Sequence, residues 1–314
     1  MAAPNVNYSD SFAATAIEHW ARDVLYDQIF EKTAVLTWLK QNQESAPDGL
    51  KIVEPLQYAQ SSTAGAFAKG ATFVVTDREI ATNAEYEWVY YGDAIAIYPQ
   101  DLMKCAGESQ KVNLLKGKMQ NLELSLSDAI NADLWASSQA TDAFIPLPVM
   151  VDATSTVGNI SSSTYAWWAS KVNTATQAIS TTTMANTYNS CSNGKAGVAP
   201  TLIAMTQTLF EGFEELVLPY YRIQDTKLGK LGFDALRYKG AEVVWDENCT
   251  SGAIYFLNDK VLKLRPHNQC ATRFLVQEGS PSEQLARARI VWSMFALTCA
   301  RRSALGKHTN KSAP

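Results

Sequence analysis

Histidine, cysteine and long apolar runs are scarce in this sequence of 314 residues, and each scarcity argues against a class of protein. The 3 histidines and 5 cysteines form no Cys-x-x-Cys pair and no metal-ligand spacing, so we expect buried free thiols and neither metal nor cofactor. No apolar run approaches the roughly 18 residues that span a bilayer, and the first residues lack the features of a signal peptide. We therefore expect a soluble protein, made in a cytoplasm, with no membrane partner.

An excess of positive charge and the familiar catalytic motifs are missing as well. The chain has 27 Lys and Arg against 31 Asp and Glu, whereas tight sequence-independent binding of nucleic acid requires a basic face. None of the strings GxSxG, HExxH, GxGxxG or the phosphate-binding P-loop occurs, so no enzymatic activity is expected. What the chain does have is 46% hydrophobic residues, enough for two or three compact units with a sizeable core.

A long helix is predicted over residues 100–139, and the rest of the chain is interpreted around it. About 30 helical residues at roughly 1.5 Å each would make a rod of about 45 Å. Such a rod suits either a helix beneath an enzyme domain or a brace between sheets at its two ends. Its apolar residues recur in steps of three and four, which places them on one helical face: Val112, Leu115, Met119, Leu122, Leu126 and Ala129.

The segment before this helix, residues 45–99, is predicted to form a long hairpin with a flexible middle. A strand containing Pro55, which favours a sheet edge, precedes a stretch of small residues and glycine, and an aromatic, β-branched run follows. A hairpin of this length has little core of its own and is marginal when isolated. The segment therefore indicates a protein that interlocks with copies of itself.

A further helix is predicted over 11–32, with Trp20 on its apolar side. This apolar side is expected to cover either the protein's own core or a neighbouring subunit.

The second half of the chain mixes helix and strand. The adjacent Trp167 and Trp168 are interpreted as a core residue beside a half-exposed one, with a stacking platform for sugars or bases as the alternative. A helix over 206–223 is expected to end near Pro219. Arg301 and Arg302 are expected to be surface charges, with pairing to carboxylates of a neighbouring subunit as the alternative. Strands are predicted over 200–205, 233–238, 241–246, 253–258, 260–265 and 288–301.

In this order, the segments resemble the major capsid proteins of tailed double-stranded DNA bacteriophages, which have the Hong Kong 97-type fold. The likeness is carried by residues 84–102, 111–135, 158–168, 200–223, 232–259 and 289–306. It implies an α+β fold with an N-terminal arm, an extended β-hairpin loop, a long spine helix, and peripheral and axial domains. The implied boundaries are 1–35 for the arm, 36–99 for the extended loop, 100–141 and 246–304 for the peripheral domain (spine helix 100–139), 142–245 for the axial domain, and 305–314 for a polar tail.

The resemblance implies a structural protein that assembles into pentamers and hexamers. These would form the icosahedral shell of a virion, made in the cytoplasm of a bacterial host, around double-stranded DNA that the near-neutral to acidic wall contacts non-specifically. The implied partners besides the chain itself are a portal, a separate scaffolding protein and a decoration protein. We expect the subunit interface to include Trp20, Phe67, Lys69 and Phe73.

Three other functions compete with a phage shell. The first is a different phage structural protein with a related fold, or an encapsulin-type compartment shell built from that fold. The second is a carbohydrate-binding module that uses Trp167 and Trp168, which leaves the long helix and the hairpin without a role. The third is an enzyme of unknown chemistry, which would require a pocket with converging titratable groups.

Overall fold

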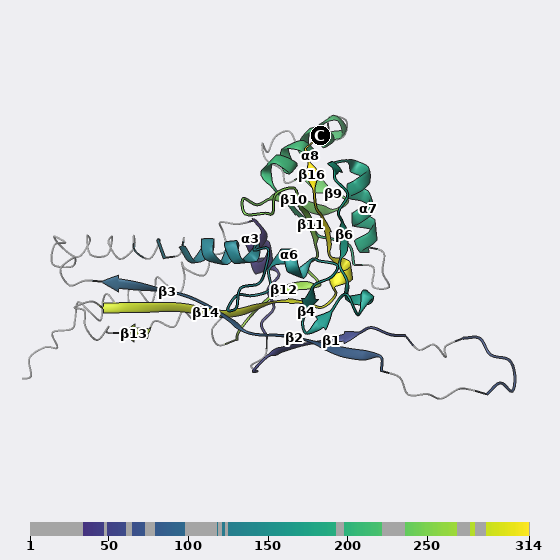
Figure 1. The fold of residues 1–314 in the computed structure, drawn as a ribbon, viewed down its shortest axis with the longest axis horizontal. Coiled ribbons are helices and arrows are strands. Elements are labelled where there is room, and N and C mark those ends of the chain that lie inside the picture. Colours follow the sequence, from purple (N-terminus) through teal and green to yellow (C-terminus); the bar gives the residue numbers. More distant parts are fainter. Residues whose placement is uncertain are drawn as a thin grey trace, which may run out of the picture.

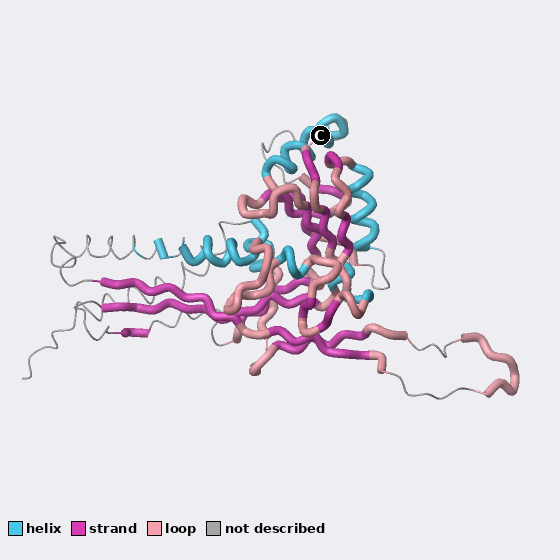
Figure 2. The backbone as a smooth tube through the Cα atoms, in the orientation of Figure 1, coloured by secondary structure: helices cyan, strands magenta, loops and turns pink. Residues whose placement is uncertain are grey.

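Two sheets organise the fold, one inside the body of the molecule and one along a ribbon that projects from it (Figure 1). The structure is a computed structural model. It describes residues 34–46, 49–60, 65–72, 79–97, 118, 121–122, 125–192, 198–221, 236–268, 277–279 and 287–313. A two-stranded hairpin leaves the body on the side opposite the ribbon (Figure 2).

The sheet in the body has six strands in the order β6-β15-β11-β8-β10-β9. Its two central strands, β8 and β11, are apolar along their whole length and are buried at every residue, as expected for strands covered on both faces. β10 runs parallel to β8, and β11 runs antiparallel to both β8 and β15. The strands are β6 (Lys171–Asn173), β8 (Leu202–Met205), β9 (Arg237–Tyr238), β10 (Ala241–Trp245), β11 (Ile254–Leu257) and β15 (Gly306–His308).

Two helices, α7 (Thr181–Ser192) and α8 (Gln207–Tyr221), cover one face of this sheet. The sequence predicted α8, which continues through Pro219 to Tyr221, but it did not predict α7, because Thr, Asn and Ser are weak helix formers. Ser180 compensates at the start of α7: its Oγ accepts a hydrogen bond from the Thr183 backbone amide at 3.3 Å. The three glutamates of α8, Glu211, Glu214 and Glu215, are exposed on the side of the helix away from the sheet.

The projecting ribbon is built on β14 (Arg287–Cys299), the longest strand described. β3 (Val89–Ile97) pairs antiparallel with β14 from Val89 opposite Phe295 to Ile97 opposite Arg287. β12 (Leu262–Pro266) and β13 (Gln277–Gly279) pair with the other edge of β14. Gly92 allows close approach of β3 and β14, since a Cβ atom there would lie 2.9 Å from the carbonyl oxygen of Val291.

The described part of the predicted long helix, residues 118, 121–122 and 125–134, runs along this ribbon (Figure 1). The prediction covered residues 100–139. Of these, residues 100–117 lie outside the described part of the chain, and residues 135–139 are described but are not helical. The buried face differs from the prediction, which placed Ala129 on it. Ala129 is exposed, and the buried apolar side chains of the described helix recur at every fourth residue: Leu122, Leu126, Ile130 and Leu134.

The hairpin consists of β1 (Ile52–Gln57) and β2 (Ala81–Tyr86), paired from Ile52 opposite Tyr86 to Gln57 opposite Ala81. Residues 65–72 lie at its far end, away from the body (Figure 2). Its base is fixed by Tyr86, whose hydroxyl donates to the Cys299 carbonyl at 2.7 Å and accepts the Cys299 amide hydrogen at 3.2 Å. The hairpin predicted from the sequence is thus attached to the body at one end.

Shorter elements connect these parts. α3 (Ala34–Gln41) packs near β10 and β12. The others are α6 (Leu147–Met150), β4 (Thr156–Val157), β5 (Ile160–Ser161), η2 (Ala166–Trp168), β7 (Gln177–Ala178), η4 (Arg302–Ala304) and β16 (Lys311–Ser312). None of the helices in the described part of the chain combines the length and the apolar character that a membrane span requires.

The polar tail expected at residues 305–314 is wrong for its described part. β15 is an interior strand of the six-stranded sheet, between β6 and β11, and β16 pairs with β7. Lys307 and His308 are nevertheless 8% and 1% exposed, because each finds a polar partner inside the body. The same sheet joins strands from both sides of the expected domain boundary at residue 245, and the division into axial and peripheral domains stays a prediction.

Candidate subunit-interaction surfaces

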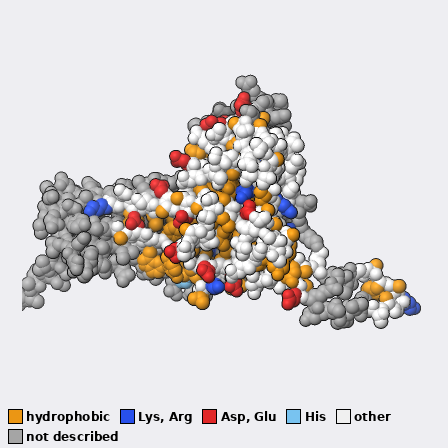
Figure 3. Space-filling model, in the orientation of Figure 1, with side chains coloured by type: hydrophobic (Ala, Val, Ile, Leu, Met, Phe, Trp, Pro, Cys, Tyr) orange, Lys and Arg blue, Asp and Glu red, His pale blue; other side chains and the backbone are white. Residues whose placement is uncertain are grey.

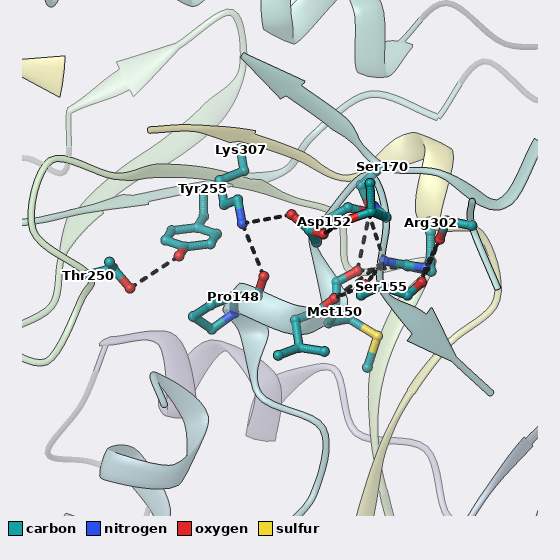
Figure 4. A network of polar contacts seen from close by, with 12 residues as sticks. Pro148, Met150, Asp152, Ser155, Ser170, Thr250, Tyr255, Arg302 and Lys307 are labelled. Atoms are coloured by element: carbon teal, nitrogen blue, oxygen red, sulfur yellow. Dashed lines mark hydrogen bonds and ion pairs between the residues drawn. The ribbon is translucent and has the colours of Figure 1, made fainter. Parts of the chain in front are cut away.

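A buried arginine ties β14 and η4 to the loop that follows α6 (Figure 4). Arg302 is 0% exposed, so the expectation that it is a surface charge is wrong. Its Nε donates to the Met150 carbonyl at 2.8 Å, and its Nη2 donates to the Asp152 carbonyl at 2.8 Å and to Ser155 Oγ at 2.6 Å. The residues next to Arg302 in the sequence do not predict its burial, because its hydrogen-bond acceptors lie about 150 positions earlier in the chain.

A second cation, Lys307, holds the same loop from the neighbouring strand. Its Nζ donates to the Pro148 carbonyl at 3.1 Å and lies 3.4 Å from Asp152 Oδ1. Burial alone would raise the pKa of Asp152, but hydrogen bonds from Thr154 and the charge of Lys307 hold it below its ordinary value. The two cations therefore hold this loop from inside the molecule, and Figure 4 shows both turned toward it.

The described residues offer little for catalysis or metal binding. They contain no group of three or more His, Cys, Asp or Glu side chains that could hold a metal ion. Cys191, Cys249 and Cys299 are buried and free, as predicted, and burial raises the pKa of Cys191 and of Cys299 to about 12, so neither is a ready nucleophile. Burial, with the nearby charge of Lys311, lowers the pKa of His308 to about 4 and keeps its imidazole neutral.

The tryptophan pair is packed as the favoured interpretation expected. Trp168 is 1% exposed, and its Nε1 donates to the Val157 carbonyl at 3.0 Å. Trp167 is half-buried, and its ring stacks on Tyr58 with 5.2 Å between the ring centroids. Since a neighbouring ring already occupies a face of Trp167, the pair does not form an open platform for a sugar.

Exposed apolar side chains are concentrated on the hairpin, the ribbon and their junction. Figure 3 shows hydrophobic side chains gathered along the lower part of the body in this view. Large exposed hydrophobic residues outside a core commonly mark interaction surfaces when they cluster. Those with the greatest exposure are Leu50 at 92%, Phe67 at 67%, Tyr90 at 62% and Val53 at 51%.

A groove of about 590 Å³ opens at the junction of the hairpin and the ribbon. Residues 85–90, at the turn from β2 into β3, form one wall, and the other lining residues come from 139–145, 156–159 and 296–297. Sequence reasoning missed this site because its walls come from separate parts of the chain. The only local signal was the pair Glu85 and Glu87, two residues apart beside an aromatic run.

No family model and no curated protein matches the sequence. A solved structure of the cyanophage A-1(L) capsid asymmetric unit matches with a TM-score of 0.66 at 15% identity, over 88% of this chain and 92% of that one. The capsid of a native GTA particle matches with a TM-score of 0.59 at 9% identity, over 87% of this chain and 90% of that one.

A structure from Mycobacterium phage Adephagia matches with a TM-score of 0.52 at 11% identity, over 88% of this chain and 90% of that one. The chain has a Hong Kong 97-like capsid fold. The α+β fold class predicted from the sequence is confirmed.

Of the four residues expected at the subunit interface of this Hong Kong 97-like fold, two lie in the described part of the chain. Phe67 and Lys69 lie in the far end of the hairpin and are exposed. Trp20 and Phe73 lie outside the described residues. The structure therefore brings Phe67 and Lys69 into one short segment, and the role of all four in subunit contacts stays a prediction.

Proposed function

We propose that the protein is the major capsid protein of a tailed double-stranded DNA bacteriophage. Pentamers and hexamers of the chain form the icosahedral shell that encloses the genome. The observation that carries the proposal is the match to a phage capsid asymmetric unit over 88% of this chain and 92% of that one. A match over nearly the full length of both chains supports a structural rather than an enzymatic role.

The shape of the subunit supports assembly on physical grounds. The far end of the hairpin, residues 65–72, has exposed side chains throughout and a two-stranded support, which is marginal in isolation. Contacts with neighbouring copies would stabilise it. In a closed symmetric shell each such contact recurs in every subunit, so weak contacts add up to a stable particle.

The remaining partners follow from this function. A portal and a separate scaffolding protein would take part in assembly, and a decoration protein would bind the finished lattice. The chain is made in the cytoplasm of a bacterial host and ends in the virion. Its net charge of −4 suits a wall that holds DNA without binding it tightly.

Electron microscopy of the overexpressed protein in negative stain, beside its sedimentation profile, tests the proposal. We expect closed shells, or rings of five and six subunits, in the lysate or after purification with varied salt and concentration. A uniform monomer of 34.5 kDa under all these conditions, with and without co-expressed scaffolding protein, would contradict it.

A further inference from the structure

Asp246 is a buried carboxyl group whose described partners are all neutral. It directly follows β10 and is 3% exposed. Its Oδ1 accepts hydrogen bonds from the Asn248 amide at 3.2 Å and from Asn131 Nδ2 at 3.4 Å. Removal of an ionised carboxylate from water is costly unless a cation pairs with it. The groups that face this carboxyl group are the side chains of Asn131 and Trp135, the backbone amides of Val35 and Asn248, and the thiol of Cys249.

These groups join the helix of residues 125–134 to the body of the molecule. Asn131 lies in the last turn of this helix, Trp135 follows its end, and Val35 belongs to α3, which packs near β10. Figure 1 shows the helix reaching the body beside α3. A contact at this point therefore influences how firmly the body holds the helix that runs along the projecting ribbon.

Three buried polar atoms at this junction have no hydrogen-bond partner among the described residues: Asp246 Oδ2, Asn131 Oδ1 and Trp135 Nε1. An ionised Asp246 can only accept hydrogen bonds, so it cannot serve Asn131 Oδ1, which also requires a donor. A protonated carboxyl group has one O–H donor. With the proton on Oδ2, this O–H can donate to Asn131 Oδ1 while Asn131 Nδ2 donates to Asp246 Oδ1. The result is the cyclic pair of a carboxylic acid with a primary amide, and the Trp135 N–H can then donate to a lone pair of Oδ2.

The surroundings of Asp246 also favour the proton. Burial raises the pKa of Asp246, although the hydrogen bonds from Asn248, Asn131, Trp135 and Val35 oppose this shift. Burial, with the nearby Asp246, raises the pKa of the Cys249 thiol as well, so this thiol keeps its proton and adds no charge.

We propose that Asp246 and Asn131 form a proton-dependent contact between the body and the helix of residues 125–134. Uptake of a proton from solvent closes the cyclic pair. Release of the proton to solvent opens the pair and leaves a buried negative charge, which weakens the attachment of the helix. The contact lies within a single subunit, so its test does not depend on the proposed shell function.

The stability that this contact contributes is greatest at low pH. An aspartate in the unfolded chain has a pKa near 3.9, and the folded pKa is higher. The contribution is therefore full below about pH 4 and is lost as the pH rises through the folded pKa.

Asp246→Asn tests this dependence, because an amide has nearly the same shape as the protonated acid and does not titrate. We expect the unfolding constant of the wild type, divided by that of the variant, to rise by about threefold or more between about pH 4 and about pH 8. Urea unfolding of both proteins at each pH measures this ratio, and groups common to both, His308 included, cancel in it. Glu247→Gln is the matched control, since Glu247 is the adjacent carboxylate and is exposed, and its ratio is expected to stay constant.

Hydrogen exchange locates the effect on the helix. At about pH 8 the amides of residues 130–135 are expected to exchange more slowly in Asp246→Asn than in the wild type, and near pH 4 the two proteins are expected to agree. Amides of β14, away from the contact, provide the internal reference.

Infrared spectroscopy of the wild type detects the proton itself. With ¹³C-labelled aspartate, we expect a carboxylic acid band that persists above the pH near 4 at which exposed aspartates ionise. The absence of this band would overturn the proposal, even if the variant did not fold. A ratio of unfolding constants that stays flat or falls as the pH rises would also overturn it, because Asp246 would then be an ionised acceptor throughout.

Discussion

Replacement of Arg302 by alanine is expected to destabilise the subunit strongly. The guanidinium group has five N–H donors, and six oxygen atoms lie within hydrogen-bonding distance of it. Five of these oxygens belong to the loop of residues 149–155, and the sixth is Ser162 Oγ. Alanine would remove the charged donor from these oxygens, leaving the four carbonyls only their bonds from Ser155, Ser162 and Ser170, and would leave a cavity beside Trp168.

The expected magnitude follows from opposing terms. Hydrogen bonds to a charged group contribute about 1.5–3 kcal/mol each, while removal of the charge from water costs several kcal/mol. Every partner of Arg302 is neutral, so alanine leaves no unpaired charge behind, and the lost hydrogen bonds together with the cavity lead us to expect a loss of about 3–5 kcal/mol for Arg302→Ala. Arg302→Lys keeps a charge but has fewer donors and no planar fork, so an intermediate loss of about 2–3 kcal/mol is expected.

Urea unfolding followed by tryptophan fluorescence measures this loss by linear extrapolation. Trp168 reports on the site because its ring lies 6.0 Å from the guanidinium carbon of Arg302. Arg301→Ala serves as the control, since Arg301 is half-buried and its Nε bonds only to Ser303 Oγ, at 3.1 Å, among the contacts described. A loss for Arg302→Ala that equals that of the control, or stays below about 1 kcal/mol, would refute the role assigned to the network.

Two further predictions concern β15. A Cβ atom at Gly306 would lie 2.6 Å from Cys191 Sγ and 2.9 Å from Thr187 Cγ2, so Gly306→Ala is expected to cost about 1–3 kcal/mol in a thermal melt, and an unchanged melt would contradict the close packing. His308 has a pKa lowered to about 4, mainly by burial. The unfolded chain takes up this proton near pH 6.5, so stability present above that pH is lost as the pH falls toward 4, by about 2 kcal/mol between pH 7 and pH 5. Urea titrations at both pH values should show this loss in the wild type and a smaller one in His308→Gln; equal losses would contradict it.

The elements that the sequence predicted well are those with a strong local pattern. The continuous apolar runs at 202–205 and 254–257 became the buried centre of a sheet, and the long run at 288–301 became β14. Pro55 was expected to mark an edge, and it lies in a two-stranded sheet opposite Asn83. In each case the composition of a few adjacent residues determines the outcome.

The elements that were missed depend on partners distant in sequence. Arg302 is an ordinary surface residue by composition, and only its acceptors in the loop after α6 explain its burial. The sequence of β15 looks polar because it contains Lys307 and His308, yet each has a polar partner inside the body, Pro148 for Lys307 and Thr187 for the Nε2 atom of His308. The groove at the junction of the hairpin and the ribbon likewise has walls from four separate segments, and a pattern within a single segment could not reveal it.

The position of β15 between β6 and β11 has a consequence for synthesis on the ribosome. β6 ends at Asn173 and β11 ends at Leu257, but the strand that joins them is not made until residues 306–308 are translated. Until then both strands present unpaired edges, which invite pairing with other chains. Pairing between such distant segments is also slow. The nascent subunit therefore completes its sheet late, and a chaperone that shields these edges during translation would protect it from aggregation.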